Sequence, residues 1–197
     1  MSLFFAGYYC FHGVDLFYPD QINNMDLIIS GTNRPDSNSL KVAVYYQKQL
    51  ESKGVSLDLL SLMDLPSDLI VSDMYGHRSE AFQRIQDRVL AAEKFLFIIP
   101  EYNGGMPGVL KSFIDACKFP ESFLDKKAAL VGIGAGRHGN LRGLEHFTGI
   151  ANHFNLHVMP MKIYLPSIHT ELDQEGNFSS DETKAFVDSQ INKFIKY

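Results

Sequence analysis

The stretch KFLFIIPEYNGGMPGVLKSFIDA, residues 94–116, decides the fold. It opens at 94–100 with an almost wholly apolar run, which is typical of a strand buried on both faces of a sheet. A polar, glycine-rich loop follows at 100–105, and residues 107–118 then place apolar side chains at helical spacing. The stretch therefore predicts a strand, a loop and a helix. The charge, phenol and amide in that loop indicate a ligand site where the buried strand ends.

The same alternation continues in both directions along the chain. Strand-like runs occur at 26–30, 55–62, 94–100, 128–134 and 156–165. Helix-like periodicity occurs at 39–53, 79–92, 107–118, 140–154 and 181–195. Helices of this length between strands force parallel pairing, with helices on both sheet faces. The pattern predicts an α/β fold, a flavodoxin-like three-layer sandwich around a five-stranded parallel sheet in the order 2-1-3-4-5.

Composition limits the classes of partner. The chain has 197 residues, a formal net charge of -5 and only 21% charged residues, so no nucleic-acid or membrane partner is expected. No apolar run approaches the roughly 18 residues that a membrane span needs. Cys10 and Cys117 are the only cysteines, and they lack metal-site spacing. We therefore expect a cytoplasmic protein without a metal site.

Residues 1–24 differ from the rest of the chain. They hold seven aromatic residues and no Lys or Arg, so they lack the basic start of a secretory signal. Two interpretations remain open. The segment is either an added or alternative-start extension before an FMN-binding domain over 25–197, as the resemblance below implies, or an aromatic segment that packs in a subunit interface.

The first candidate loop is SGTNRPDSNSL, residues 30–40. Its hydroxyl, amide and guanidinium groups belong to Thr32, Arg34, Ser37, Asn38 and Ser39. They stand directly before a predicted helix, whose free N–H groups and dipole favour an anion. The loop therefore predicts a phosphate site. The alternative is an ordinary helix cap formed by Ser37 or Ser39.

A second glycine-rich loop, GIGAGRHGN, follows the fourth predicted strand at 132–140. Residues 134–139 match the dinucleotide pattern GxGxxG, but they follow the wrong strand and lack an acidic residue about 20 positions later. We therefore interpret the loop as a wall on the other side of the ligand. Its candidate residues are Gly134, Gly136 and Arg137. Arg137 and His138 are candidates for contact with that ligand or with the phosphate of an incoming dinucleotide, and the alternative is a solvated pair in the loop.

PEYNGGMPGVLKSFID and GTNRPDSNS together resemble the NADPH-dependent FMN reductase family of flavodoxin-like flavoproteins. The resemblance covers residues 26 to about 195. It implies bound FMN, with NADPH or NADH as co-substrate. It also implies that the loop after the third strand contacts the flavin through Pro100, Glu101, Tyr102, Asn103, Gly104 and Gly105. Family members commonly carry Ser where Gly105 stands.

The resemblance further implies an FMN-dependent NAD(P)H oxidoreductase. Hydride would pass from NAD(P)H through bound FMN to a flavin, quinone, azo or metal-oxyanion acceptor, and no protein side chain need act as a catalytic acid or base. A homodimer or homotetramer is expected. The alternatives are a flavodoxin-type electron carrier, which usually has Trp beside the flavin, and a non-catalytic flavin-binding protein. This chain has no Trp.

Overall fold

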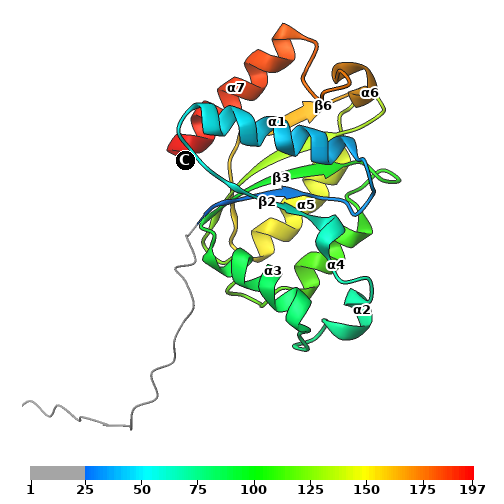
Figure 1. Cartoon of the computed structure of the whole chain (residues 1–197), viewed down its shortest axis with the longest axis vertical. Coiled ribbons are helices and arrows are strands. Elements are labelled where there is room, and N and C mark those ends of the chain that lie inside the picture. Colours follow the sequence, from blue (N-terminus) through cyan, green and yellow to red (C-terminus); the bar gives the residue numbers. More distant parts are fainter. Residues whose placement is uncertain (1–24) are drawn as a thin grey trace, which may run out of the picture.

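The structure, a computed structural model, describes residues 25–197, so both interpretations of residues 1–24 lie outside it. A central sheet lies between two layers of helices (Figure 1). The strands are β1 (Leu27–Ser30), β2 (Asp58–Ser61), β3 (Lys94–Pro100), β4 (Lys127–Ile133), β5 (His157–Val158) and β6 (Ile163–Leu165). The helices are α1 (Asn38–Ser52), η1 (Leu62–Asp64), α2 (Leu69–Ser72), α3 (Glu80–Ala91), α4 (Gly108–Ala116), α5 (Leu141–His153), α6 (Ile168–Glu171) and α7 (Asp181–Lys196).

The sheet is parallel throughout. Its order is β2-β1-β3-β4-β5, and β6 also pairs with β4. The α/β class and the predicted strand order are therefore confirmed. The order reverses between β1 and β3, so their carboxyl ends diverge into loops on opposite sides and leave room for a ligand.

The segment 156–165, which was predicted to hold the fifth strand, is strand only in part. The chain forms two short strands, β5 opposite the start of β4 and β6 opposite its end. Pro160 lies in the gap and has no N–H to donate. The buried Gln190 side chain bridges the break, because its Nε2 donates to the carbonyl oxygens of Leu130 and Met161, both at 3.0 Å. A side-chain amide thus replaces the missing ladder bonds.

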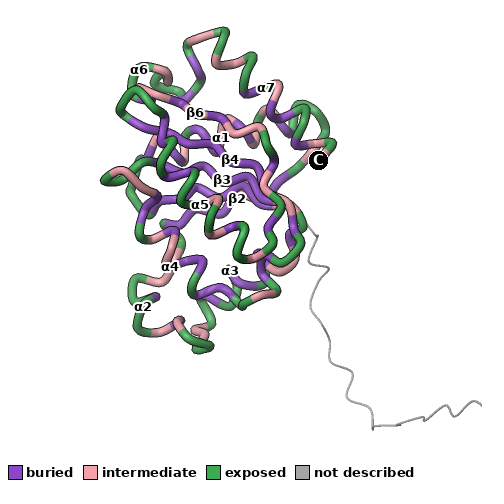
Figure 2. Tube along the Cα trace, turned by 180° about the vertical axis from the view of Figure 1, so that it is seen from behind, coloured by how far each residue is buried: buried purple, intermediate pink, exposed green. Residues whose placement is uncertain are grey.

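The two faces of the sheet bury alternate residues of each strand. Leu27 and Ile29 pack toward α3, α4 and α5, whereas Ile28 packs toward α1 and α7. Figure 2 shows the strands as buried segments inside an exposed shell of helices and loops. Each fully buried aliphatic side chain contributes about 1.5–3 kcal/mol. This two-sided burial explains the apolar runs that predicted the strands.

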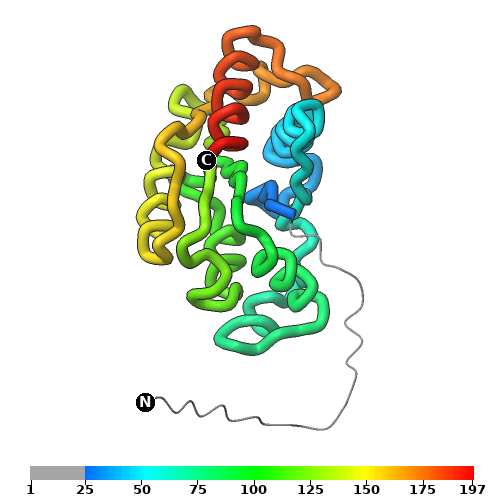
Figure 3. The backbone as a smooth tube through the Cα atoms, turned by 90° about the vertical axis from the view of Figure 1, so that its left-hand side faces the viewer, coloured from blue at the N-terminus to red at the C-terminus, as the bar shows by residue number. Residues whose placement is uncertain are grey.

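Serine caps fix where three helices begin. Ser37, Ser79 and Ser180 each accept a hydrogen bond from the backbone N–H three residues later, at the starts of α1, α3 and α7. On one face of the sheet α1 lies beside α7 (Figure 3), and Lys53 Nζ pairs with Asp188 Oδ1 at 2.7 Å between them. Among the described helices, none is long and apolar enough to cross a membrane.

Candidate active site

Three loops meet at the carboxyl edge of the sheet and enclose a cavity of about 340 Å³. They follow β1, β3 and β4, which are the three positions predicted from the sequence. The predicted site residues that line the cavity are Arg34, Ser37, Asn38, Ser39, Pro100, Glu101, Tyr102 and Gly134. Pro35, Asp36, Ile133, Ala135 and Ile168 complete the lining.

The loop after β1 turns tightly against β3. Gly31 N donates to Ile98 O at 2.9 Å, and a Cβ atom at Gly31 would lie only 2.9 Å from that same oxygen. Only glycine allows the two backbones to approach so closely. The loop then reaches α1, where Ser37 Oγ accepts from Leu40 N at 3.2 Å. Ser37 is therefore a helix cap, as the structural alternative for this loop held.

Ser39 does not cap the helix. Its side chain is buried, and its Oγ has no hydrogen-bond partner within residues 25–197. An unsatisfied buried hydroxyl costs about 1–3 kcal/mol, unless a ligand satisfies it. Ser39 stands in the first turn of α1 and belongs to the cavity lining, where free N–H groups attract an anion. A phosphate group fits this donor set, and Arg34, exposed and without a side-chain partner in the described chain, adds a cation.

The loop after β3 is a two-residue turn. Tyr102 and Gly105 exchange backbone hydrogen bonds of 2.9 and 3.1 Å, and Asn103 and Gly104 between them have φ angles of 52° and 77°. Asn-Gly is the preferred pair for such a left-handed turn. The Tyr102 hydroxyl lies 2.8 Å from Thr32 Oγ1, so the loops after β1 and β3 are joined. Thr32 itself is buried below the cavity rather than lining it.

The loop after β4 packs against β6. A Cβ atom at Gly139 would lie 2.6 Å from Leu165 N, and Gly139 has a φ angle of 54°. The GxGxxG pattern therefore includes a glycine that the packing of this chain requires. Ile168 N donates to Gly134 O at 3.1 Å and so brings α6 to the cavity.

Asn140 is a residue that the sequence analysis missed. It is fully buried, its Nδ2 donates to Ile99 O at 2.8 Å, and its Oδ1 accepts from Gly143 N at 3.0 Å. It therefore caps α5 and ties the third loop to β3. An Asn directly before an apolar-periodic segment is a recognised helix-start signal, so the cap was detectable. The bond to Ile99 was not, since it joins residues far apart in sequence.

Several predicted residues lie outside the cavity lining. Asn103, Gly104 and Gly105 form the outer part of the turn after β3, and Gly136 and Arg137 are exposed in the loop after β4. Glu101 does line the cavity. A Cβ atom at Gly134 would lie 3.4 Å from its Oε2, so this carboxylate lies between the second and third loops.

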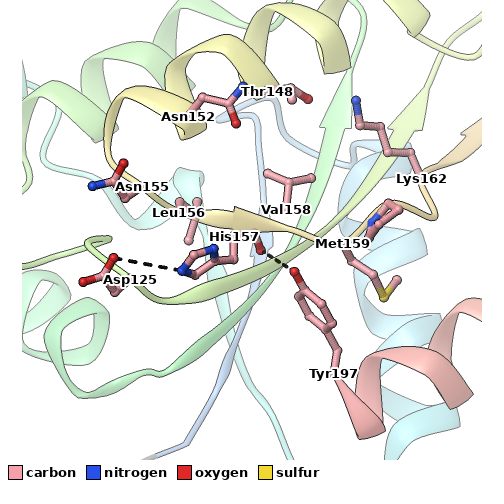
Figure 4. A pocket seen from close by; sticks show the side chains of 11 residues that line it. Asp125, Thr148, Asn152, Asn155, Leu156, His157, Val158, Met159, Lys162 and Tyr197 are labelled. Carbon is pink, nitrogen blue, oxygen red and sulfur yellow. Dashed lines mark hydrogen bonds and ion pairs between the residues drawn. The ribbon is translucent and has the colours of Figure 1, made fainter.

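A larger cavity of about 590 Å³ runs along β5 (Figure 4). It reaches Asp125, just before β4 begins, and thus the amino ends of the strands. Two of its polar contacts are drawn in the figure: the His157 ring lies 4.0 Å from the Asp125 carboxylate, and the Tyr197 hydroxyl donates to His157 O at 3.4 Å. The smaller cavity is the better candidate, because there a buried hydroxyl lacks a protein partner.

Comparisons with known proteins identify the family to which the chain is similar. Residues 27–170 match the family model described as NADPH-dependent FMN reductase. An NAD(P)H-dependent FMN reductase of Pseudomonas aeruginosa is 30% identical over 167 residues, which are 83% of this chain and 89% of the relative. A 2-hydroxy-1,4-benzoquinone reductase of a Burkholderia species is 25% identical over 174 residues, covering 86% and 93%. The solved structure of a flavoenzyme NAD(P)H:(acceptor) oxidoreductase from Paracoccus denitrificans superimposes with a TM-score of 0.72 at 26% identity, covering 88% of this chain and 95% of that one.

Proposed function

The chain belongs to the NADPH-dependent FMN reductase family, and from this premise we propose that it is an FMN-dependent NAD(P)H oxidoreductase. Bound FMN supplies the redox chemistry, since it accepts hydride from NAD(P)H and returns the electrons to a second substrate. The proposed acceptor is a flavin, quinone, azo compound or metal oxyanion. Relatives named as quinone reductases and as an NADPH azoreductase support the quinone and azo classes.

We assign the FMN phosphate to the first loop and the first turn of α1. The observation that carries the proposal is Ser39 Oγ, the buried hydroxyl of a cavity-lining residue, which has no partner in the described chain. Ser37, Asn38 and Arg34 line the same cavity and supply further donors. Several donors and a guanidinium around one dianion make charge-assisted hydrogen bonds, which are about twice as strong as neutral ones.

We assign the flavin ring to the region between the second and third loops. The turn at 102–105 is held rigid by its two backbone hydrogen bonds, and Thr32 fixes the Tyr102 hydroxyl. The backbone of Pro100–Gly105 would face the ring edge on one side, with Gly134, Gly136 and Arg137 on the other. The protein's part is then to bind the ring, orient it and leave one face open to the nicotinamide.

We also propose a homodimer or homotetramer located in the cytoplasm, with residues 25–197 as the FMN-binding domain. Large apolar side chains on the described surface support association: Ile70, Val71, Tyr75 and Phe119 are 69, 87, 93 and 62% exposed. Burial of these side chains against a second subunit would remove their apolar surface from water. Cys117, a buried free thiol, is compatible with a reducing compartment.

An absorbance spectrum of the purified protein tests the proposed function. We expect a flavin band that bleaches when NADPH is added without oxygen and returns when a quinone follows. If NADPH and NADH both leave a bound flavin oxidised while a one-electron donor reduces it, the electron-carrier alternative is correct instead. If FMN binds and no donor bleaches it, the protein is a non-catalytic flavin binder.

A further inference from the structure

The six arginines of the chain divide into two groups of three. Those of the first group lie in or just before α3, and each is held by the protein. Arg84 Nη2 pairs with Glu80 Oε1 at 2.5 Å, and Arg88 Nε pairs with Asp58 Oδ2 at 2.7 Å. Arg78 Nη1 donates to the carbonyl oxygen of the preceding residue at 2.8 Å.

The other three are Arg34, Arg137 and Arg142. Within residues 25–197, none of their guanidinium groups makes a hydrogen bond or an ion pair. All three belong to the carboxyl edge of the sheet: Arg34 in the loop after β1, Arg137 in the loop after β4 and Arg142 in the first turn of α5. The part of the molecule that is proposed to bind anionic molecules thus carries every arginine that the described chain leaves unpaired.

Arg142 lies beside the turn that borders the cavity. A Cβ atom at Gly104 would be 3.9 Å from Arg142 Nη1, and one at Gly105 would be 3.8 Å from His146 Nδ1. Arg142 and His146 are four residues apart, so they share one face of α5. That face therefore lies against the Tyr102–Gly105 turn. Neither side chain lines the 340 Å³ cavity, and His146 instead lines a separate cavity between α4 and α5.

The segment that carries Arg142 is locally basic, although the whole chain carries -5 and the carboxylate of Glu101 lies between the second and third loops. No acidic residue occurs between Ile133 and Glu145, a segment that holds Arg137, His138 and Arg142. Glu145 is itself held by Lys162 Nζ at 2.6 Å. A planar guanidinium without a protein partner suits a phosphate, because it donates two parallel hydrogen bonds to two oxygens.

We propose that Arg142, together with Arg137 on the loop that leads into α5, binds a phosphate group of the nicotinamide dinucleotide. The inference rests on the proposed function and deepens it. Arg34, on the loop after β1, lines the cavity and would hold the FMN phosphate, whereas Arg142 lies outside that lining, in the first turn of α5 beside the Tyr102–Gly105 turn. A dinucleotide that approached the flavin from the side of this turn would bring its phosphates near Arg142.

Equilibrium binding to the oxidised, FMN-loaded protein tests this inference without using turnover. Arg142→Gln and Arg137→Gln are each titrated with NADP⁺ and NAD⁺ by calorimetry. We expect about a tenfold loss of NADP⁺ affinity in Arg142→Gln and a smaller loss in Arg137→Gln, because one charge-assisted hydrogen bond corresponds to about that factor. Arg84→Gln is the matched control: it removes the same charge from an exposed arginine in α3, and affinity should stay within twofold of wild type.

The outcomes separate the two claims. A loss confined to NADP⁺ assigns Arg142 to the 2′-phosphate, and an equal loss for NAD⁺ assigns it to the pyrophosphate; both support the inference. Unchanged affinities in both variants overturn it and leave the proposed function standing if NADPH still bleaches the wild-type flavin. A lower FMN content in Arg142→Gln, with dinucleotide affinity retained, also overturns it. A wild-type protein that binds neither dinucleotide overturns the inference and the proposed function together.

Discussion

The two ends of the sheet differ in whether their polar side chains have partners within the described chain. At the amino end, Lys94 Nζ donates to Ile195 O at 3.3 Å, and Lys126 Nζ donates to Val89 O and Leu90 O at 3.0 and 2.9 Å. Asp26 Oδ1 accepts from Lys94 N at 2.7 Å. These charged groups are thus supplied with partners by the protein itself.

At the carboxyl end, comparable groups are left without partners in the described chain. The Ser39 hydroxyl is buried and unsatisfied, and the guanidinium groups of Arg34, Arg137 and Arg142 make no hydrogen bond or ion pair within the described residues. Buried polar groups in folded proteins are nearly always hydrogen-bonded, so the Ser39 hydroxyl calls for a partner, and the three arginines, which are exposed, are free to bind an anion. The difference separates groups that stabilise the fold from groups that bind, and each kind should respond differently to mutation.

Lys126→Met should have the largest effect on stability. Lys126 is buried, and its ammonium group holds the last carbonyls of α3 while its stem packs in the core. Met keeps most of the stem but leaves the Val89 and Leu90 carbonyls unsatisfied. We expect the free energy of unfolding to fall by about 2–3 kcal/mol in urea titrations. FMN affinity of the folded protein should not change, and a parallel loss of affinity would remove the contrast between the two ends.

Arg34→Ala should weaken FMN binding and leave stability almost unchanged, which is the reverse of the result expected for Lys126→Met. Arg34 is exposed and unpaired within the described residues, so its loss should change the free energy of unfolding without FMN by less than about 0.5 kcal/mol. FMN affinity should fall about tenfold or more, because a charge-assisted hydrogen bond to phosphate contributes about 1.5–3 kcal/mol. Fluorescence titration with FMN and riboflavin measures this. Equal affinity of the wild type for the two would show that the loop does not select phosphate.

Tyr46 extends the comparison to a polar group in the protein interior that has a hydrogen-bond partner within the protein. Its hydroxyl donates to Gln190 Oε1 at 2.8 Å, and burial raises the pKa of Tyr46 well above its ordinary value. The unfolded chain releases this proton above about pH 10 while the folded protein retains it, so the contribution of Tyr46 to stability is lost as pH rises beyond that value. Tyr46→Phe should cost about 1 kcal/mol at neutral pH and remove a decline of about 1.4 kcal/mol per pH unit above pH 10. Urea unfolding of both proteins at pH 9, 10 and 11 measures the difference.

The sequence predicted more of the fold than of the candidate site. The apolar runs at 26–30 and 94–100 identify strands because both faces of each are buried, and alternation with helices then dictates parallel order. Pro160 signalled the break in the last strand, but Gln190, which bridges it, comes from a distant helix. No local pattern reveals such a contact.

The site was only partly accessible for the same reason. Three loops were identified because each follows a buried strand. The sequence offers two serines, Ser37 and Ser39, as possible caps of α1. Only Ser37 caps the helix, because only its hydroxyl reaches a free backbone N–H. Ile168 enters the cavity through α6, and Arg142 lies beside Gly104 through α5. Both are consequences of tertiary packing.

The matched pair Ser39→Ala and Ser122→Ala tests whether the unpartnered hydroxyl of Ser39 marks the FMN phosphate site. Both serines are buried, but Ser122 Oγ accepts from Gln86 Nε2 at 2.9 Å, whereas Ser39 Oγ has no partner in the described chain. Each variant is measured for unfolding free energy without FMN and for FMN affinity. For Ser39→Ala we expect unchanged or slightly higher stability and about a fivefold to tenfold loss of FMN affinity; for Ser122→Ala we expect a loss of about 1 kcal/mol in stability and unchanged affinity. If Ser39→Ala binds FMN as tightly as the wild type, the unpartnered hydroxyl does not mark the phosphate site and the account is wrong.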